Sequence, residues 1–220
     1  KNTGWEAENM NGQILEILNG IPGKTGFYYK NLTTGEKWEV RSEEPMIAAS
    51  VIKIPVLAEV FARLEAGAAD KNELYRIREE DKLPSCGALN YMHTGLEVTL
   101  EDLYTLMIIL SDNTATNLLI KKFSMEKMFR GKLISPRASQ EMISILTNQR
   151  LNGKMPFHFK GKVKIAHKTG EDGGITHDVG IVFAPQPFVA CFCSNETDVP
   201  LFERAIQDIT KLLYDLQPGC

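Results

Sequence analysis

The segments of this chain that resemble β-strands fall at its two ends, and a long run of helical patterns separates them. Alternating apolar side chains predict strands over residues 25–31, 37–40, 163–166, 179–183 and 188–193. Strands from both ends can pair only if the chain returns to the sheet with which it began. We therefore predict one five-stranded antiparallel sheet, interrupted in sequence by a helical region.

Amphipathic helical patterns cover most of the remaining chain. They extend over residues 5–18, 51–64, 99–110, 113–123, 136–146 and 199–216. Thr99 followed by Asp102 is a capping-box start signal, and Ser135 can cap the helix after it.

These patterns predict an α/β fold of the α+β type. The sheet is flanked by N- and C-terminal helices and carries an all-helical insertion. We predict a discontinuous sheet-and-helix domain over residues 1–49 and 151–220 and a helical domain over residues 50–150. The active site is expected in the cleft between the two.

The composition and net charge of the chain limit the classes of partner that it can bind. The chain has 220 residues with 43% apolar composition, enough for a sizeable core, and its net charge of -3 offers no basic excess for nucleic acid. No apolar run approaches the roughly 18–20 residues of a membrane span. Residues 1–11 lack the apolar stretch of a secretion signal. We expect a monomer that binds a small molecule, with no nucleic acid partner and no transmembrane segment.

Neither the cysteines nor the histidines show the spacing of a metal site, so we expect no metal and no cofactor. The cysteines, interpreted as small buried thiols with a frayed end at the last, are Cys86, Cys191, Cys193 and Cys220. The histidines are His93, His158, His167 and His177. A folded cluster of His167 with His177 stays open at this point.

Ser50 and Lys53 form the first candidate motif, at the start of the second helical pattern. Residues three apart share a helix face, so the lysine amine can reach the hydroxyl. A helix start also favours a developing alkoxide, and a desolvated lysine can lose its proton near neutral pH and act as a base. Alone, a serine and a lysine at this spacing are commonplace.

Ser111, Asp112 and Asn113 form the second motif, between two helices. A turn there can aim the Ser111 hydroxyl and the Asn113 amide at a substrate, the first to relay a proton and the second to bind an amide carbonyl. Asp112 is predicted to be a buried structural group. The alternative is that Ser111 merely caps the following helix.

The third motif, His167 to Gly170, is predicted to end a strand. Lys168 and Thr169 can hold a carboxylate there, and Gly170 lets a ligand approach the backbone. The backbone N–H groups of Glu171 and Ser50 are candidate oxyanion donors. The alternative is an ordinary basic strand end and turn.

The motifs occur in the order S-x-x-K, S-D-N and K-T-G, a set typical of class A β-lactamases and penicillin-binding proteins. The chain resembles the class A β-lactamase family over nearly its whole length. Residues 83–91 look like the family segment that places an aromatic, here Tyr91, at the cleft rim, and residues 99–119 are very similar to the family's central helices.

The resemblance implies a serine β-lactamase without a cofactor, located outside the cytoplasm. Ser50 would be the acylated nucleophile and Lys53 its proton partner. Ser111 would shuttle a proton, and Asn113 would bind the acylamino side chain. The remaining groups, expected to bind substrate, are Tyr91, Lys168, Thr169, Gly170 and Glu171.

One family feature is missing. Class A enzymes carry a loop between the second and third motifs, with a glutamate that activates the deacylating water and an asparagine after it. Here only 55 positions separate Asn113 from Lys168, and Glu126 lacks a following asparagine. Either the molecule holds a loop that this sequence omits, which we expect, or the loop is deleted.

Three functions compete. The first is β-lactam hydrolysis. The second is a penicillin-binding D-Ala-D-Ala peptidase, or a deacylation-deficient β-lactamase, with a long-lived acyl-enzyme. The third is a silent module that binds cell-wall peptide, against which the intact Ser50, Lys53, Ser111 and Lys168 argue.

Overall fold

The computed structural model describes residues 4–122 and 135–219. The chain divides into two compact units. Unit 1 comprises Lys1–Val51 and Asn152–Cys220, and unit 2 comprises Ile52–Leu151. The predicted domains, residues 1–49 with 151–220 and residues 50–150, stay predictions.

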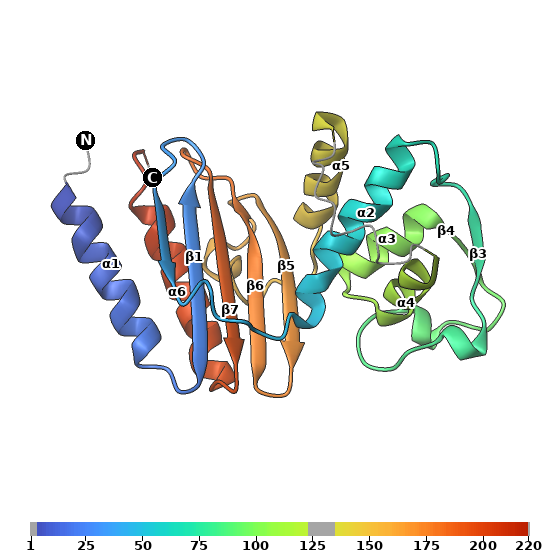
Figure 1. Cartoon of the computed structure of the whole chain (residues 1–220), viewed down its shortest axis with the longest axis horizontal. Coiled ribbons are helices and arrows are strands. Elements are labelled where there is room, and N and C mark those ends of the chain that lie inside the picture. The colour runs from blue at the N-terminus through green and yellow to red at the C-terminus, as the bar shows by residue number, and fades with distance from the viewer. Residues whose placement is uncertain (1–3, 123–134, 220) are drawn as a thin grey trace. The chain divides into compact units, whose positions relative to one another are not determined.

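Unit 1 is built on a five-stranded antiparallel sheet with the order β2-β1-β7-β6-β5 (Figure 1). The strands are β1 (Lys24–Asn31), β2 (Lys37–Val40), β5 (Ile165–Asp172), β6 (Ile175–Val182) and β7 (Phe188–Asn195). The predicted fold class is thereby confirmed: strands from both ends of the chain join in one sheet, where β1 pairs with β7.

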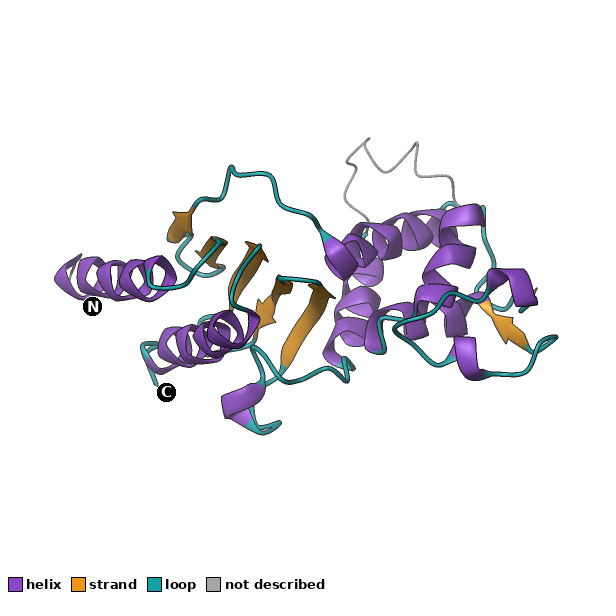
Figure 2. Cartoon of the chain, turned by 90° about the horizontal axis from the view of Figure 1, so that it is seen from below, coloured by secondary structure: helices purple, strands orange, loops and turns teal. Residues whose placement is uncertain are grey.

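Two helices, α1 (Gly4–Asn19) and α6 (Val199–Asp215), cover one face of this sheet (Figure 2). Apolar side chains that recur about every 3.6 residues along the helices pack on the side chains of every second residue of the strands. Its members include Ile14, Leu18, Phe27, Phe192 and Ile206. The opposite face of the sheet carries the other half of each strand's side chains.

Unit 2 packs four described helices around a second core. They are α2 (Lys53–Glu65), α3 (Leu100–Ile109), α4 (Asn113–Lys122) and α5 (Pro136–Thr147). The Thr99–Asp102 capping box and the Ser135 cap are both confirmed. The insertion is not all-helical, however, because β3 (Leu74–Arg76) pairs with β4 (Glu97–Thr99).

Two boundaries that matter for function differ from prediction. Ser50 lies in a 3-10 turn, η1 (Ala49–Ile52), and the α-helix begins only at Lys53. Ala49 has φ of +43°, a left-handed conformation that cannot belong to an α-helix. The third motif lies inside β5 rather than at a strand end, because the pairing with β6 continues to Asp172.

The cysteines are only partly as expected. Cys86 is exposed, so its interpretation as a buried thiol is wrong. Cys191 and Cys193 are free and partly buried, and burial raises the pKa of Cys191 to about 12. A thiol with so high a pKa is a poor nucleophile. Cys220 lies outside the described residues.

Candidate active site

Lys53 contacts the second motif within unit 2. Its side chain is 2% exposed, and Nζ donates to Ser111 Oγ at 2.9 Å, to the Ser111 carbonyl at 2.8 Å and to Asn113 Oδ1 at 2.9 Å. A buried ammonium needs such acceptors to offset lost hydration. Three predicted site residues, from α2, the turn after α3 and the start of α4, therefore lie in one hydrogen-bonded group.

This environment changes the acidity of Lys53. Burial lowers its pKa to about 8, although the charges of Cys86 and Asp112 act in the opposite direction. Burial disfavours the charged form of an amine, and here it outweighs the attraction. The Lys53 amine is thus available in both protonation states near neutral pH.

The turn that presents Ser111 is held by Asp112. Ser111 has φ of +54°, and the fully buried Asp112 accepts hydrogen bonds from the backbone N–H groups of Ala88 (2.6 Å), Leu89 (2.8 Å) and Ala115 (2.9 Å). The prediction that Asp112 is structural is confirmed. Its bond to Ala115 caps α4, so Ser111 Oγ does not serve as that cap and instead accepts from Lys53.

Unit 1 contributes the third motif. Lys168 and Gly170 alternate with Thr169 and Glu171 along β5, so the two pairs of side-chain positions lie on opposite faces. The Lys168 side chain is fully buried, and its Nζ donates to the Thr169 carbonyl at 2.7 Å. The Glu171 carboxylate lies 2.9 Å from the buried Lys154 ammonium.

Gly170 lies directly against the segment that contains Ser50. A Cβ added there would meet Val51 Cγ2 and His177 Cδ2 at 3.1 Å and the backbone N of Ser50 at 3.3 Å. Since Gly170 has no unusual φ, the closeness of its neighbours explains the glycine. Ser50 and the K-T-G motif are therefore adjacent within unit 1.

We expect Gly170→Ala to slow, by about tenfold, the acylation of Ser50 that the family resemblance implies. It should also lower the free energy of unfolding by about 1–3 kcal/mol, the usual cost of overpacking. The acylation rate and a denaturant titration measure the two effects. Gly173→Ala is the matched control, because nothing lies within 4 Å of the added Cβ. Equal behaviour of the two variants would contradict the close approach.

The other predicted site residues are placed as follows. Tyr91, in the 3-10 turn η3 (Leu89–Tyr91) of unit 2, is 77% exposed.

His167 and His177 do not form a metal cluster, since His167 contacts Asp178 and Asn152 while His177 contacts backbone groups. Lys154 was not among the predicted site residues, because its only signal in the sequence is a lysine beside Gly153 in a polar loop.

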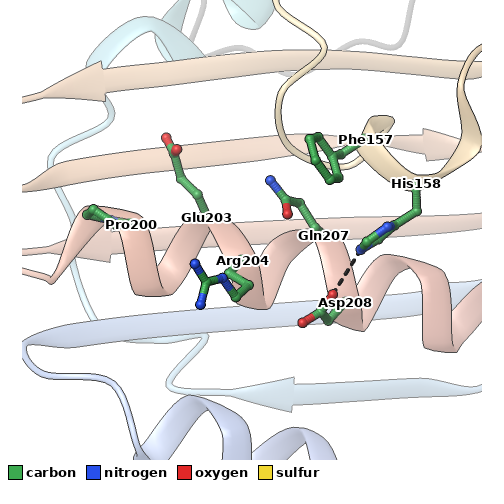
Figure 3. A pocket seen from close by; sticks show the side chains of 7 residues that line it. All are labelled: Phe157, His158, Pro200, Glu203, Arg204, Gln207 and Asp208. Carbon is green, nitrogen blue, oxygen red and sulfur yellow. Dashed lines mark hydrogen bonds and ion pairs between the residues drawn. The ribbon is translucent and has the colours of Figure 1, made fainter.

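The described residues contain a hollow over α6 and η5 (Phe157–Phe159) in unit 1, shown in Figure 3. Its lining consists of Phe157, His158, Pro200, Glu203, Arg204, Gln207 and Asp208. No predicted site residue lines it.

Among the described helices, none has the length and apolar character needed to cross a bilayer. The expected junction near Phe123 and Glu126, where the family loop is missing, lies outside the described residues.

Comparison with known proteins agrees with this geometry. A sequence model of the Beta-lactamase enzyme family matches residues 9–128 and 124–217. A protein named β-lactamase from Rhodobacter capsulatus is 27% identical over 113 residues, which cover 51% of this chain and 38% of that protein.

Two solved structures share the fold over nearly all of the chain. The structure of PBP-A is 25% identical, with a TM-score of 0.84, and the match covers 94% of this chain and 95% of that one. A β-lactamase from Sphaerobacter thermophilus is 24% identical, with a TM-score of 0.87, over 96% of this chain and 99% of that one. Because the two matched parts of the family model together cover most of this chain, the chain belongs to the Beta-lactamase enzyme family.

Proposed function

We propose that this protein is a serine β-lactamase that opens the β-lactam amide through an acyl-enzyme on Ser50. The observation that carries the proposal is the buried Lys53 amine, which lies 2.9 Å from Ser111 Oγ and has a pKa of about 8. An amine near neutral acidity beside a second hydroxyl suits proton transfer in acyl transfer.

In the proposed reaction, Ser50 Oγ bonds to the lactam carbonyl carbon, and its proton passes to the neutral Lys53 amine. The ring C–N bond then breaks, and Ser111 relays a proton to the leaving nitrogen. Water finally cleaves the ester, giving its hydroxyl to the acyl group and a proton back to the Ser50 oxygen. Lys53, one helical turn after Ser50 and hydrogen-bonded to Ser111, is the group that connects the two proton transfers.

The remaining residues are proposed to bind substrate. Asn113 binds the acylamino side chain, and Lys168 and Thr169 hold the carboxylate, the first as a cation and the second through its hydroxyl. The N–H groups of Ser50 and Glu171 stabilise the oxyanion. Gly170 admits the substrate to the backbone, and the exposed Tyr91 contacts its rim.

A second candidate is a penicillin-binding D-Ala-D-Ala peptidase, or a deacylation-deficient β-lactamase, whose acyl-enzyme persists. The family model matches this chain in two parts that overlap at residues 124–128, close to the place where the glutamate-bearing loop is missing, and a true deletion of that loop would support this candidate. Without that glutamate, water has no positioned base. A variant of PBP-A, at 25% identity, was solved as an acyl-enzyme complex with penicillin G.

A chromogenic cephalosporin followed by intact-protein mass spectrometry separates these functions. Steady turnover supports the β-lactamase, and a stoichiometric stable adduct on Ser50 supports the second candidate. A protein that shows neither is the silent module, and both proposals fail. Tryptic mapping tests the loop in the same sample, because the peptide of residues 123–127 forms only if Phe123 and Ser124 are joined as written.

Either substrate, a β-lactam or a cell-wall peptide, would be met outside the cytoplasmic membrane. We therefore propose an extracytoplasmic location, supported by the family alone. Fractionation of the source cell followed by immunodetection tests it.

A further inference from the structure

His177 uses both of its ring nitrogens on backbone groups of unit 1. The side chain is 1% exposed, Nε2 lies 2.7 Å from the Ile47 carbonyl oxygen, and Nδ1 lies 3.1 Å from the Ser194 backbone N. A carbonyl can only accept and a peptide N–H can only donate, so the ring must be neutral with its proton on Nε2. Burial also lowers the pKa of His177 below its usual value.

The imidazole takes the place of a missing sheet contact. The register of β6 with β7 ends at Asp178 and Phe192, and beyond it the Ser194 hydroxyl binds both the N–H and the carbonyl of Thr176. His177 Nδ1 accepts the Ser194 N–H that the ladder leaves over. Nδ1 of the ring is thus bonded to β7, while Nε2 bonds to the segment that precedes Ser50.

That entering segment needs to be held. Ala49 has φ of +43°, a conformation that costs a non-glycine residue about 1–3 kcal/mol unless its surroundings impose it. Ile47 is bound at both of its backbone groups, through its carbonyl to His177 and through its N–H to Asn195 Oδ1 at 3.3 Å. These two bonds fix the chain two residues before the strained position.

The same ring also touches the strand beside the nucleophile. Gly170 on β5 pairs with His177 on β6. An added Cβ at Gly170 would meet the His177 ring and the Ser50 backbone N. His177 therefore lies in contact with the segment before Ser50 and beside the β5 glycine that Ser50 approaches.

We propose that His177 is a positioning residue for Ser50: its Nε2–H holds the Ile47 carbonyl and so imposes the left-handed turn at Ala49 that aligns the Ser50 N–H and hydroxyl beside Gly170. The inference rests on the proposed acylation of Ser50 and adds a residue to it. His177 touches no reacting atom, so its effect should fall on the rate of acylation rather than on substrate binding.

Two isosteric variants separate positioning from stability. His177→Asn keeps an acceptor near the Nδ1 position for Ser194 but loses the bond to Ile47, whereas His177→Gln can keep a donor near Nε2 and loses the bond to Ser194. Misplacement by about 1 Å can cost about a hundredfold in rate. We expect His177→Asn to slow acylation at saturating chromogenic cephalosporin by about ten- to hundredfold, with His177→Gln within about threefold of the unmodified protein.

Thermal melting and the half-saturating concentration complete the test. Both variants should melt below the unmodified protein, and half-saturation should change by less than about threefold. Acylation that simply follows melting temperature, or that is equal in the two variants, overturns the proposal. If either variant does not fold, Asn195→Ala tests the same tether from the other side: a severalfold loss of rate is expected, and an unchanged rate overturns it.

The two levels of inference fail differently. Absence of acylation in the unmodified protein refutes the proposed function itself. Normal acylation there, together with normal acylation in His177→Asn, refutes only the positioning role.

Discussion

Ser50→Ala is expected to abolish both β-lactam turnover and the covalent adduct, lowering the acylation rate by at least about a thousandfold, because no other group supplies the nucleophile. The hydroxyl is the atom that the proposed ester requires. Ser50 lies in η1, next to the K-T-G strand in unit 1. Gly170 lies beside the backbone N of Ser50, so removal of the hydroxyl leaves that close approach in place. Stopped-flow absorbance with a chromogenic cephalosporin and intact-protein mass spectrometry measure the two outcomes.

Ser42→Ala provides the control, since this serine is exposed and its hydroxyl donates to Glu39 at 3.1 Å. It should behave as the unmodified protein does. A Ser50→Ala protein that melts normally and still turns over the cephalosporin would remove the central assignment. An adduct that persists at full stoichiometry would place the nucleophile elsewhere.

Lys53→Met is the second change with a large expected effect. Methionine keeps the length and burial of the side chain but cannot take the Ser50 proton, so the acylation rate should fall by about 10²–10⁴-fold, the usual contribution of a positioned general base. Because the Ser111 and Asn113 acceptors lose their donor, the variant should also melt below the unmodified protein. Lys121→Met, on the exposed side of α4, is the control.

The pH dependence follows from the same group. Acylation by the unmodified protein should rise as the pH passes through about 8 and the Lys53 amine loses its proton. Stability should also rise from about pH 8 to about pH 10.5, because in that range the unfolded chain binds a proton at Lys53 that the folded chain does not. Both trends should disappear in Lys53→Met. An acylation rate that is flat from pH 6 to pH 10 in the unmodified protein would exclude this amine as the base.

Much of this architecture was accessible from local patterns. Period-2 alternation predicted the five strands of the main sheet, and the capping pair of Thr99 with Asp102 marked the start of α3. That Lys53 and Ser111 would belong to one site was predicted only from the three motifs together, since a lysine three residues after a serine is ambiguous alone. The buried carboxylate of Asp112 was foreseen because a charged side chain between two apolar helices needs backbone donors.

The features that were missed depend on contacts between distant parts of the chain. β4 is three residues long, and it is a strand only because β3 pairs with it. The extension of β5 to Asp172 depends on its partner strand, and the 3-10 turn at Ser50 depends on the strained Ala49. His177 could not be recognised as a tether because Ile47 lies 130 positions earlier in the sequence.

The central pairing of the main sheet has a consequence for synthesis of the chain. β1 spans Lys24–Asn31, but its neighbour β7, Phe188–Asn195, is made more than 150 residues later. At about 5–20 residues per second the first hairpin waits roughly ten to thirty seconds with one edge unpaired. An open strand edge invites pairing with other chains. A nascent molecule is therefore expected to be open to pairing with other chains along β1 until β7 has emerged from the ribosome.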